Sequence, residues 1–316
     1  MCASDDAPKP PLLVGTELPD VAQLSSRVAV ALGQNPSVFT GPGTNTYLVG
    51  HGESRLLLDT GSGHAEYMPV LEAALARVGC KRIQGIVLTH AHPDHIGGVE
   101  QVRAHFGPMP VYKLPWPTDR ELAGPGGEVS PIAIANPDRL AEGPLETLAE
   151  GDVVETEGAR LRALFTPGHA PDHLCFMLEE EQSLFSGDNV LGIGTTVIPA
   201  ESGDLGDYMR SLERALAEAP GEIYPAHGPR IRGGVAKIRE YLEHRRARER
   251  QVLEALAEGE REVMAMVRRI YVGYPESLHP AAAQSLTSHL KKLEREGRVR
   301  SEPGPGDERQ WLLVSA

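Results

Sequence analysis

The segment LTHAHPDHIGG, residues 88–98, constrains this chain more than any other feature of its sequence. It places three histidines and an aspartate within six positions, directly after an apolar run. His90 and His92 are two residues apart, so in an extended chain their side chains point the same way. Asp94 and His95 follow one short turn later, where the chain has changed direction. The segment therefore offers two separate sets of nitrogen and oxygen donors, which indicates two metal sites.

Two donor sets of this size do not complete two coordination spheres, so further ligands must come from elsewhere in the chain. Three candidates each follow an apolar run that is typical of a buried strand. Strand ends on one edge of a sheet are where α/β sites assemble, and an aspartate there can bridge two cations through its two oxygens. The candidates are His169 in RALFTPGHAPDH, Asp188 in SLFSGDN and His227 in EIYPAHGP.

Strands and helices are mixed over roughly the first 235 residues, in two similar halves. This order predicts an α/β protein in which two sheets pack as a sandwich with helices on both outer faces, a four-layer αββα arrangement. We expect strands at 27–32, 46–49, 55–58, 86–88, 152–155, 161–165, 174–178, 183–186 and 222–225. We expect helices at 66–78, 98–106, 208–219 and 234–256.

The chain changes character beyond residue 257. Two helices, at 260–271 and 280–296, precede two strands, at 298–301 and 311–314, that can pair as a hairpin. Helices followed by a hairpin predict a winged-helix-like domain. We therefore expect a loose N-terminal segment at 1–22, a catalytic domain at 23–235, a linking helix at 236–257 and a winged-helix-like domain at 258–316.

The charge is unevenly distributed. The chain has a net charge of −13, which does not favour binding of nucleic acid or an anionic membrane by the whole surface. Residues 236–316 carry 15 basic and 13 acidic side chains, whereas residues 1–235 carry 16 and 31. The basic residues of the tail form either a strip for RNA phosphates or a solvated face that helps to shape a cleft. These residues are Lys291, Lys292, Arg295, Arg298 and Arg300.

The sequence also bears on compartment and partners. Its three cysteines form no CxxC pattern, which suits a reducing compartment. Residues 1–20 lack the apolar stretch of a signal peptide, and no apolar run approaches the ~20 residues of a membrane span. We therefore expect a cytoplasmic protein with no membrane contact and no obligate protein partner.

The seven donors together resemble the metallo-β-lactamase superfamily, in its hydrolase branch with an HxHxDH motif. The resemblance assigns one zinc ion to His90, His92 and His169, the other to Asp94, His95 and His227, and a bridging position to Asp188. Lactamases commonly carry cysteine at that position, so aspartate favours the glyoxalase-II-like, nuclease-like and thioesterase-like branches. In that family Asp59, in LLLDTG, steadies the HxHxDH loop, although it could also simply cap its turn.

A narrower resemblance is to the lactamase-beta 2-like group, called beta-lactamase-like protein 2 in animals. The group is known for endoribonuclease activity on single-stranded RNA, and fungal relatives with the same motifs are thioesterases on acyl carrier proteins. The matching motifs are GTNTYLV (43–49), THAHPDHIGG, TPGHAPDH, FSGDNVLGIGTTV (185–197), YPAHGP and SHLKKLEREGRV (288–299).

The resemblance implies hydrolysis by a hydroxide that two zinc ions share, with Mn²⁺ or Fe as alternative metals. Asp94, His173 and Asp59 are the candidate catalytic residues among protein side chains. His173 could support a ligand or donate a proton, or it could only hydrogen-bond near the start of a strand. Thr195 and Thr196 could donate to a substrate oxygen, or they could be plain turn residues.

Residues 119–144 are rich in Gly, Pro and Asn and predict an inserted surface loop that could roof a cleft. Lys113 and Arg120 lie near this loop in sequence and could neutralise an anionic substrate. The resemblance favours an endoribonuclease that acts on single-stranded RNA, and the alternative is a hydrolase of small-molecule or carrier-linked thioesters or esters. Hydrolysis of a β-lactam, or binding without catalysis, is a weaker alternative.

Overall fold

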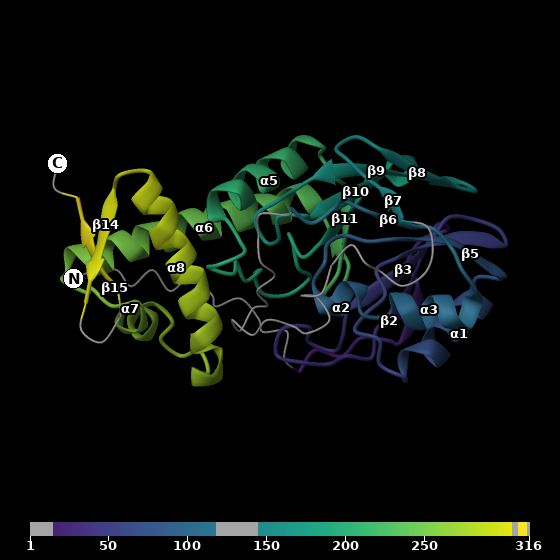
Figure 1. The fold of residues 1–316 in the computed structure, drawn as a ribbon, viewed down its shortest axis with the longest axis horizontal. Coiled ribbons are helices and arrows are strands. Elements are labelled where there is room, and N and C mark those ends of the chain that lie inside the picture. The colour runs from purple at the N-terminus through teal and green to yellow at the C-terminus, as the bar shows by residue number, and fades with distance from the viewer. Residues whose placement is uncertain (1–14, 118–144, 305–308, 315–316) are drawn as a thin grey trace.

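The computed structural model describes residues 15–117, 145–304 and 309–314. Two β-sheets pack face to face, and helices cover both outer faces (Figure 1). The sheets have seven and six strands, in the orders β1-β2-β3-β4-β5-β6-β7 and β13-β12-β11-β10-β9-β8. The predicted four-layer αββα sandwich with a C-terminal winged-helix domain is therefore confirmed.

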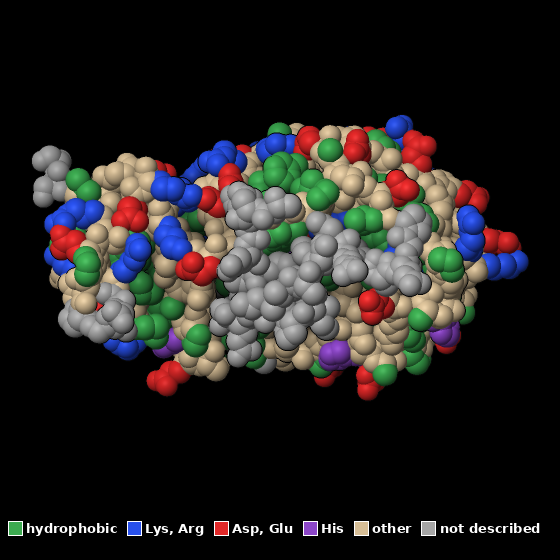
Figure 2. All heavy atoms as spheres, in the orientation of Figure 1, with side chains coloured by type: hydrophobic (Ala, Val, Ile, Leu, Met, Phe, Trp, Pro, Cys, Tyr) green, Lys and Arg blue, Asp and Glu red, His purple; other side chains and the backbone are tan. Residues whose placement is uncertain are grey.

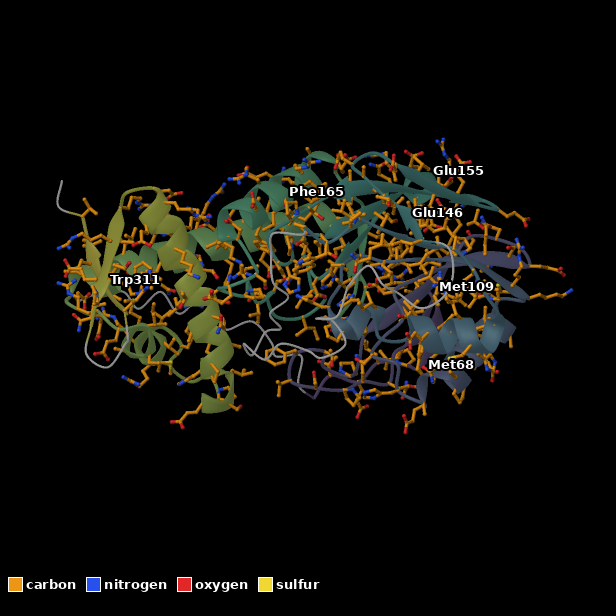
Figure 3. All side chains as sticks on the ribbon, viewed as in Figure 1. Met68, Met109, Glu146, Glu155, Phe165 and Trp311 are labelled. Atoms are coloured by element: carbon orange, nitrogen blue, oxygen red, sulfur yellow. The ribbon has the colours of Figure 1, made fainter. Side chains whose placement is uncertain are left out.

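The first sheet begins as an antiparallel meander and continues as parallel strands from β4 to β7. Because β4 and β5 are parallel, the segments that follow these two strands leave the sheet at the same edge. The strands are β1 (Val21–Gln23), β2 (Val28–Leu32), β3 (Asn45–Val49), β4 (Ser54–Leu58), β5 (Arg82–Val87), β6 (Val111–Lys113) and β7 (Leu145–Thr147). Its helices are α1 (Tyr67–Arg77), α2 (Pro93–Ile96) and α3 (Val99–Phe106). Met68 and Met109 pack in the core on its outer face (Figure 3).

The second sheet is antiparallel except for the parallel pair β11 and β12. Its strands are β8 (Val153–Thr156), β9 (Ala159–Phe165), β10 (Leu174–Leu178), β11 (Ser183–Gly187), β12 (Glu222–Pro225) and β13 (Ile231–Arg232), and η1 (Glu179–Glu181) is a single turn between β10 and β11. Helices α5 (Leu205–Ala217) and α6 (Gly234–Ala257) cover its outer face (Figure 1). The predicted strands agree with these bounds to within a few residues, and those at 174–178 and 222–225 agree at both ends.

Aromatic side chains fill the layer between the two sheets. The ring of Phe185, in β11, lies 5.1 Å from that of Tyr47 and 5.0 Å from that of Tyr224, measured between centroids. The three residues come from β3, β11 and β12, so the contacts join the first sheet to the second. Such rings bury large apolar areas and fix how the sheets face each other.

The C-terminal domain packs a hairpin against two helices. It contains α7 (Val263–Ile270), η2 (Glu276–Leu278), α8 (His279–Arg295), β14 (Val299–Pro303) and β15 (Arg309–Leu313). Trp311, in β15, is buried in its core (Figure 3). Val252 and Leu256 at the end of α6 belong to the same core, whereas Ile238 near its start packs under the second sheet. Helix α6 is therefore part of both cores and does more than link them.

Carboxylates neutralise the basic strip of the tail. Lys292 Nζ lies 2.7 Å from Glu249 Oε2, and Arg295 pairs with Asp204, the N-cap residue of α5. Figure 2 shows acidic and basic side chains intermixed at this end of the molecule. These ion pairs join α8 to α5 and α6, which favours the expectation that the strip shapes the cleft over the expectation of an RNA surface. The remaining pairs are Lys291 with Glu201, Arg298 with Glu249 and Arg300 with Glu302.

Some expectations fall on other parts of the chain. The loop at 119–144, with Arg120, and most of the N-terminal segment lie outside the described residues. Within residues 15–117, 145–304 and 309–314, no helix combines the length and the apolar character that crossing a membrane requires. Two of the three cysteines are described, and both are free and buried.

We expect Leu178→Ala to lower the free energy of unfolding by about 2–5 kcal/mol, because it opens a cavity between the sheets. Leu178 is 0% exposed, whereas Leu145 in β7 is 37% exposed. The same change at Leu145 should therefore stay within about 0.5 kcal/mol of wild type. Urea unfolding of the two variants measures the difference, and equal losses would contradict the layer arrangement.

Candidate metal centre

The HxHxDH segment leaves β5 in an extended conformation and then turns into α2. His92 has φ −68° and ψ 145°, as expected for a residue that precedes proline. Pro93 then occupies the first position of the helix, where its missing N–H costs nothing. Asp94 and His95 lie within that short helix. The change of direction that the sequence predicts is therefore present, and it separates the two donor sets.

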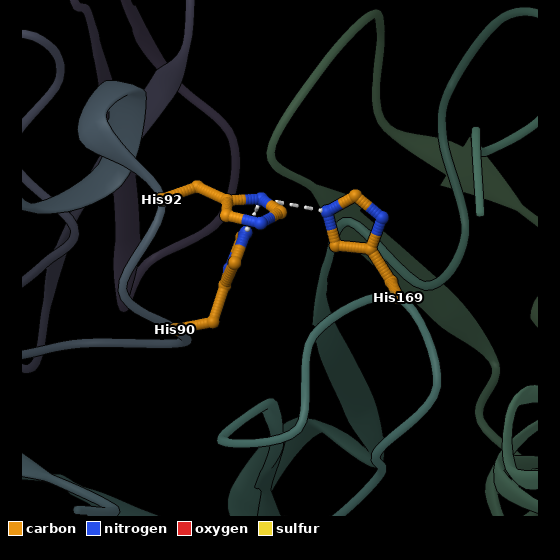
Figure 4. A group of neighbouring side chains, drawn as sticks. All are labelled: His90, His92 and His169. Atoms are coloured by element: carbon orange, nitrogen blue, oxygen red, sulfur yellow. Dashed lines mark hydrogen bonds between the residues drawn. The ribbon is translucent and has the colours of Figure 1, made fainter. Parts of the chain in front are cut away.

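The first donor set consists of three imidazoles. His92 Nδ1 lies 2.9 Å from His90 Nε2 and 3.0 Å from His169 Nε2 (Figure 4). The rings come from two loops, one after β5 and one after β9. Three ring nitrogens that converge in this way can each contribute one bond to a single cation.

The second donor set mixes carboxylate and imidazole. His227 Nε2 lies 3.2 Å from both Asp94 Oδ2 and Asp188 Oδ1, and His95 Nε2 lies 3.5 Å from the same two oxygens. The other oxygen of Asp188, Oδ2, lies 3.4 Å from His169 Nε2 in the first set. The carboxylate of Asp188 therefore stands between the two sets, with one oxygen toward each.

The donor atoms fit a pair of divalent cations. All seven candidate donors of the two sets lie close together, although they span residues 90 to 227 of the chain. His95 Nε2 and Asp188 Oδ1 are buried, and the polar contacts that the structure gives them, at 3.2 to 3.5 Å, are with other members of the donor set. Burying such atoms is costly unless something binds them. Imidazole and carboxylate are ligands for zinc, manganese and iron, so the residues match the expected chemistry.

The electrostatics of the two sets differ. Burial and the neighbouring histidines lower the pKa of His92 to about 3 and hold that of His90 well below its ordinary value, so these rings are neutral. Burial alone would raise the pKa of Asp188, but the charges of His227 and His95 outweigh it and hold the pKa well below the usual range. Burial would lower the pKa of His227, but Asp188 and Asp94 outweigh it and raise that pKa to about 9. Metals bind neutral imidazole and ionised carboxylate, so His92 and Asp188 are already in the binding form, whereas His227 must release a proton.

Asp59 anchors the HxHxDH loop from the end of β4. Its carboxylate accepts hydrogen bonds from Thr89 N–H at 2.9 Å, from Thr89 Oγ1 at 2.9 Å and from His95 Nδ1 at 2.8 Å. The bond to Nδ1 directs Nε2 of His95 toward Asp94 and Asp188. Asp59 itself has φ +58°, a strained value for a residue with a side chain.

His173 positions Asp188 and does not face the cleft. Its Nε2 accepts the backbone N–H of Asp188 at 3.1 Å, and its Nδ1 lies 3.0 Å from Thr166 Oγ1. Both ring nitrogens are therefore engaged, which favours the expectation that His173 supports a ligand over the expectation that it donates a proton. Gly187 is required beside it, because its φ is +49° and a Cβ there would lie 2.6 Å from His173 Nε2.

Lys113 also lies away from the cleft. It is buried, its Nζ lies 2.8 Å from Asp172 Oδ2, and it donates to the carbonyl of Leu114. The expectation that it neutralises a substrate is therefore corrected, because a carboxylate of the protein already neutralises its charge. Asp172 belongs to the loop that carries His169, so this ion pair fixes that loop to β6.

The two threonines after Asp188 differ in role. Thr196 is buried, and its hydroxyl donates to the carbonyl of Asp188 at 2.5 Å. Its own carbonyl accepts a hydrogen bond from Arg245 of α6. Thr195 is partly exposed and lines the cavity beside the donors. Thr196 therefore supports Asp188, and Thr195 is the threonine whose side chain a substrate could meet.

Sequence reasoning missed the residues that hold the loop of His227. The side-chain amide of Asn45 donates to the carbonyls of Pro225 and Gly228 at 2.9 and 2.8 Å, one on each side of His227. Tyr47 donates to the Pro225 carbonyl at 2.6 Å. The only signal in the sequence is a polar residue at the start of the apolar strand NTYLV.

A cavity of about 480 Å³ lies beside the donors, between the sandwich and the C-terminal domain. Asp94, His169 and Asp188 line one end. Its remaining wall is largely apolar and aromatic, with two arginines of α6. These wall residues include Val38, Phe39, Leu191, Val197, Tyr271, Tyr274, Leu278, Ala281, Arg245 and Arg248.

Two family models match this chain, one over the sandwich and one over the C-terminal domain. Residues 39–227 match the metallo-beta-lactamase superfamily, and residues 263–311 match the beta-lactamase associated winged helix domain. Together the two matches cover most of the sandwich and the C-terminal hairpin with its helices.

Similar proteins span nearly the whole chain. The atrochrysone carboxyl ACP thioesterase of Claviceps purpurea (strain 20.1) is 36% identical over 324 residues, which cover 99% of this chain and 94% of that protein. The beta-lactamase-like protein 2 homolog of Drosophila melanogaster is 38% identical, over 90% and 93%. A solved metallo-beta-lactamase family protein from Thermus thermophilus has a TM-score of 0.72 at 24% identity, over 92% of this chain and all of the other, and shows the same fold.

We expect Asp59→Asn to weaken metal binding about 10–100-fold, because it removes the charge and one acceptor that orient His95. Competition with a fluorescent chelator measures the affinity, and circular dichroism checks that the variant is folded. Glu53→Gln, at an exposed carboxylate, is the matched control and should bind as wild type does. Unchanged affinity in Asp59→Asn would show that the loop holds its position without this anchor.

We expect Lys113→Met to destabilise the fold by about 3–5 kcal/mol, because it removes the buried ion pair between Lys113 and the carboxylate of Asp172. Adding Asp172→Asn should restore part of this loss. The free energies from urea unfolding of the single and double variants form a double-mutant cycle. Losses that simply add would mean that the two side chains do not stabilise each other.

Proposed function

This chain belongs to the metallo-beta-lactamase superfamily, and we propose that it hydrolyses acyl thioesters with two zinc ions. Members of the superfamily are metal-dependent hydrolases, and this chain is one of them. The observation that carries the choice of substrate is the largely apolar cavity beside Asp188. A cavity of this size and lining suits an acyl chain better than a charged polynucleotide backbone.

We assign the seven donors to the two ions by their distances. His90, His92 and His169 would hold one ion, and Asp94, His95 and His227 would hold the other. Asp188 would touch both, since one oxygen faces each set. A bound metal pair supplies Lewis acidity and a water-derived nucleophile at neutral pH.

The other side chains act on the geometry of this reaction. Asp59 orients His95, and His173 holds the backbone of Asp188 in place. Thr195 is the candidate donor to the thioester carbonyl, because it lines the cavity beside Asp188. A thiolate of pKa about 8.5 can leave without a proton, so the reaction does not need His173 as a general acid.

The expected endoribonuclease activity has less support. The five residues of the basic strip at 291–300 are paired with carboxylates, and the chain has a net charge of −13. Binding of a long RNA requires several free cations along the phosphates. A relative of this length named as a thioesterase supports the thioester alternative.

We expect the purified protein to contain zinc and to hydrolyse thioesters of N-acetylcysteamine and of acyl carrier protein, and not to cleave single-stranded RNA. Asp188→Asn should lower kcat/KM by on the order of 100-fold or more, because metal polarisation of the substrate contributes several kcal/mol. Glu240→Gln, at an exposed carboxylate, should leave the rate unchanged.

Metal analysis and paired assays of the same preparation decide the outcome. Loss of activity with chelator and recovery with zinc would support the metal assignment. Metal-dependent cleavage of RNA that falls steeply with salt, together with no thioester turnover, would replace this proposal with a nuclease.

A further inference from the structure

Two arginines of α6 line the same cavity as the metal centre. Arg245 and Arg248 are three residues apart, so they share one face of the helix. They are 3% and 8% exposed, yet both border the same cavity as Asp188 and His169. A buried guanidinium is unusual, because removing it from water is costly unless a partner compensates its charge.

No described carboxylate lies within ion-pair distance of either arginine, in contrast to the paired cations of α8. Among the described residues, the Nε atoms of both are buried without a hydrogen-bond partner. The polar contacts that the structure gives them are neutral: Arg245 donates to the carbonyl of Thr196, and Arg248 donates to Gln251 Oε1. Two positive charges therefore border the cavity, and within the described residues neither is paired with a carboxylate.

Aromatic rings hold both guanidinium groups in place. Arg245 lies 5.0 Å from the ring centre of Tyr208, and Arg248 lies 4.1 Å from that of Tyr271. Cation–π contacts of this kind orient a planar guanidinium and leave its edge to bind a ligand. Tyr271 belongs to the C-terminal domain, so that domain helps to form the site.

Two histidines border the arginines without adding or neutralising charge. Burial and the nearby charges of Arg245 and Arg248 lower the pKa of His244 to about 3. The same causes hold the pKa of His289, in α8, well below its ordinary value. Both rings are therefore neutral, and His244 lines the cavity. The charge of the cluster comes from the arginines alone.

We propose that Arg245 and Arg248 bind an oxyanion group of the substrate, a carboxylate or a phosphate, and so select anionic thioesters. The planar guanidinium fork matches the oxygens of either group. Thr196 connects this subsite to the metal centre, because its carbonyl accepts from Arg245 and its hydroxyl donates to the carbonyl of Asp188. The inference rests on the proposed thioesterase function and specifies its substrate class.

The test compares matched substrates that differ in one charged group. Glutaryl-N-acetylcysteamine and its methyl ester differ in a carboxylate on the acyl side. Acetyl-4'-phosphopantetheine and acetylpantetheine differ in a phosphate on the thiol side. Wild type should favour the anionic member of one pair by about tenfold or more in kcat/KM, as a charge-assisted hydrogen bond allows. The pair that shows the preference identifies the source of the oxyanion.

Variants of α6 test whether Arg245 and Arg248 cause the preference for the anionic substrate. Arg248→Gln should reduce it to about twofold or less, and Arg248→Lys should keep part of it. Arg246→Gln is the matched control, because Arg246 is exposed and points to Glu213. It should keep the full preference. No preference in either pair, or a preference that survives in Arg248→Gln, would overturn the proposal.

A binding measurement separates this inference from the proposed function. Sulfate should raise the melting temperature of wild type and Arg246→Gln more than that of Arg248→Gln. If no thioester is hydrolysed, the proposed function fails and the sulfate titration alone decides the subsite. Equal stabilisation of all three proteins would then overturn it.

Discussion

Three hydrogen bonds to one buried carboxylate fix the centre of this molecule. Asp59 receives two of them from Thr89 and one from His95, and it thereby sets the path of the segment that carries four metal-ligand candidates. The arrangement is possible because β4 and β5 are parallel neighbours, so the acceptor and the loop leave the sheet at the same edge. The loops of the second sheet then bring their donors toward this fixed loop.

The sequence was sufficient for the parts of the fold that are apolar and periodic. The strands at 174–178 and 222–225 were predicted at both ends because every residue of the first, and nearly every residue of the second, is buried. Strands β1, β6, β7 and β13 were missed, since each has only two or three residues. The ligand candidates could be found because each follows an apolar run and carries a side chain that binds metals.

The supporting contacts could not be predicted, because they join residues far apart in the chain. Lys113 had the charge that an anionic substrate would need, but its partner Asp172 lies 59 positions away and takes up that charge. Asn45 holds carbonyls about 180 residues distant. Arg245 and Arg248 resemble Arg246 in a charged helical sequence, and only burial distinguishes them.

The length of helix α6 limits which insertions and deletions its sequence can accept. The helix is 24 residues long, and its two ends belong to two hydrophobic cores. The direction in which side chains point at one end therefore fixes the direction in which they point at the other. One inserted residue near its middle would turn the far half by about 100°. Arg248 and Tyr271 would then turn away from Arg245, although no residue of the cavity had been altered. A one-residue insertion or deletion within this helix is therefore expected to disturb the cavity between the two cores.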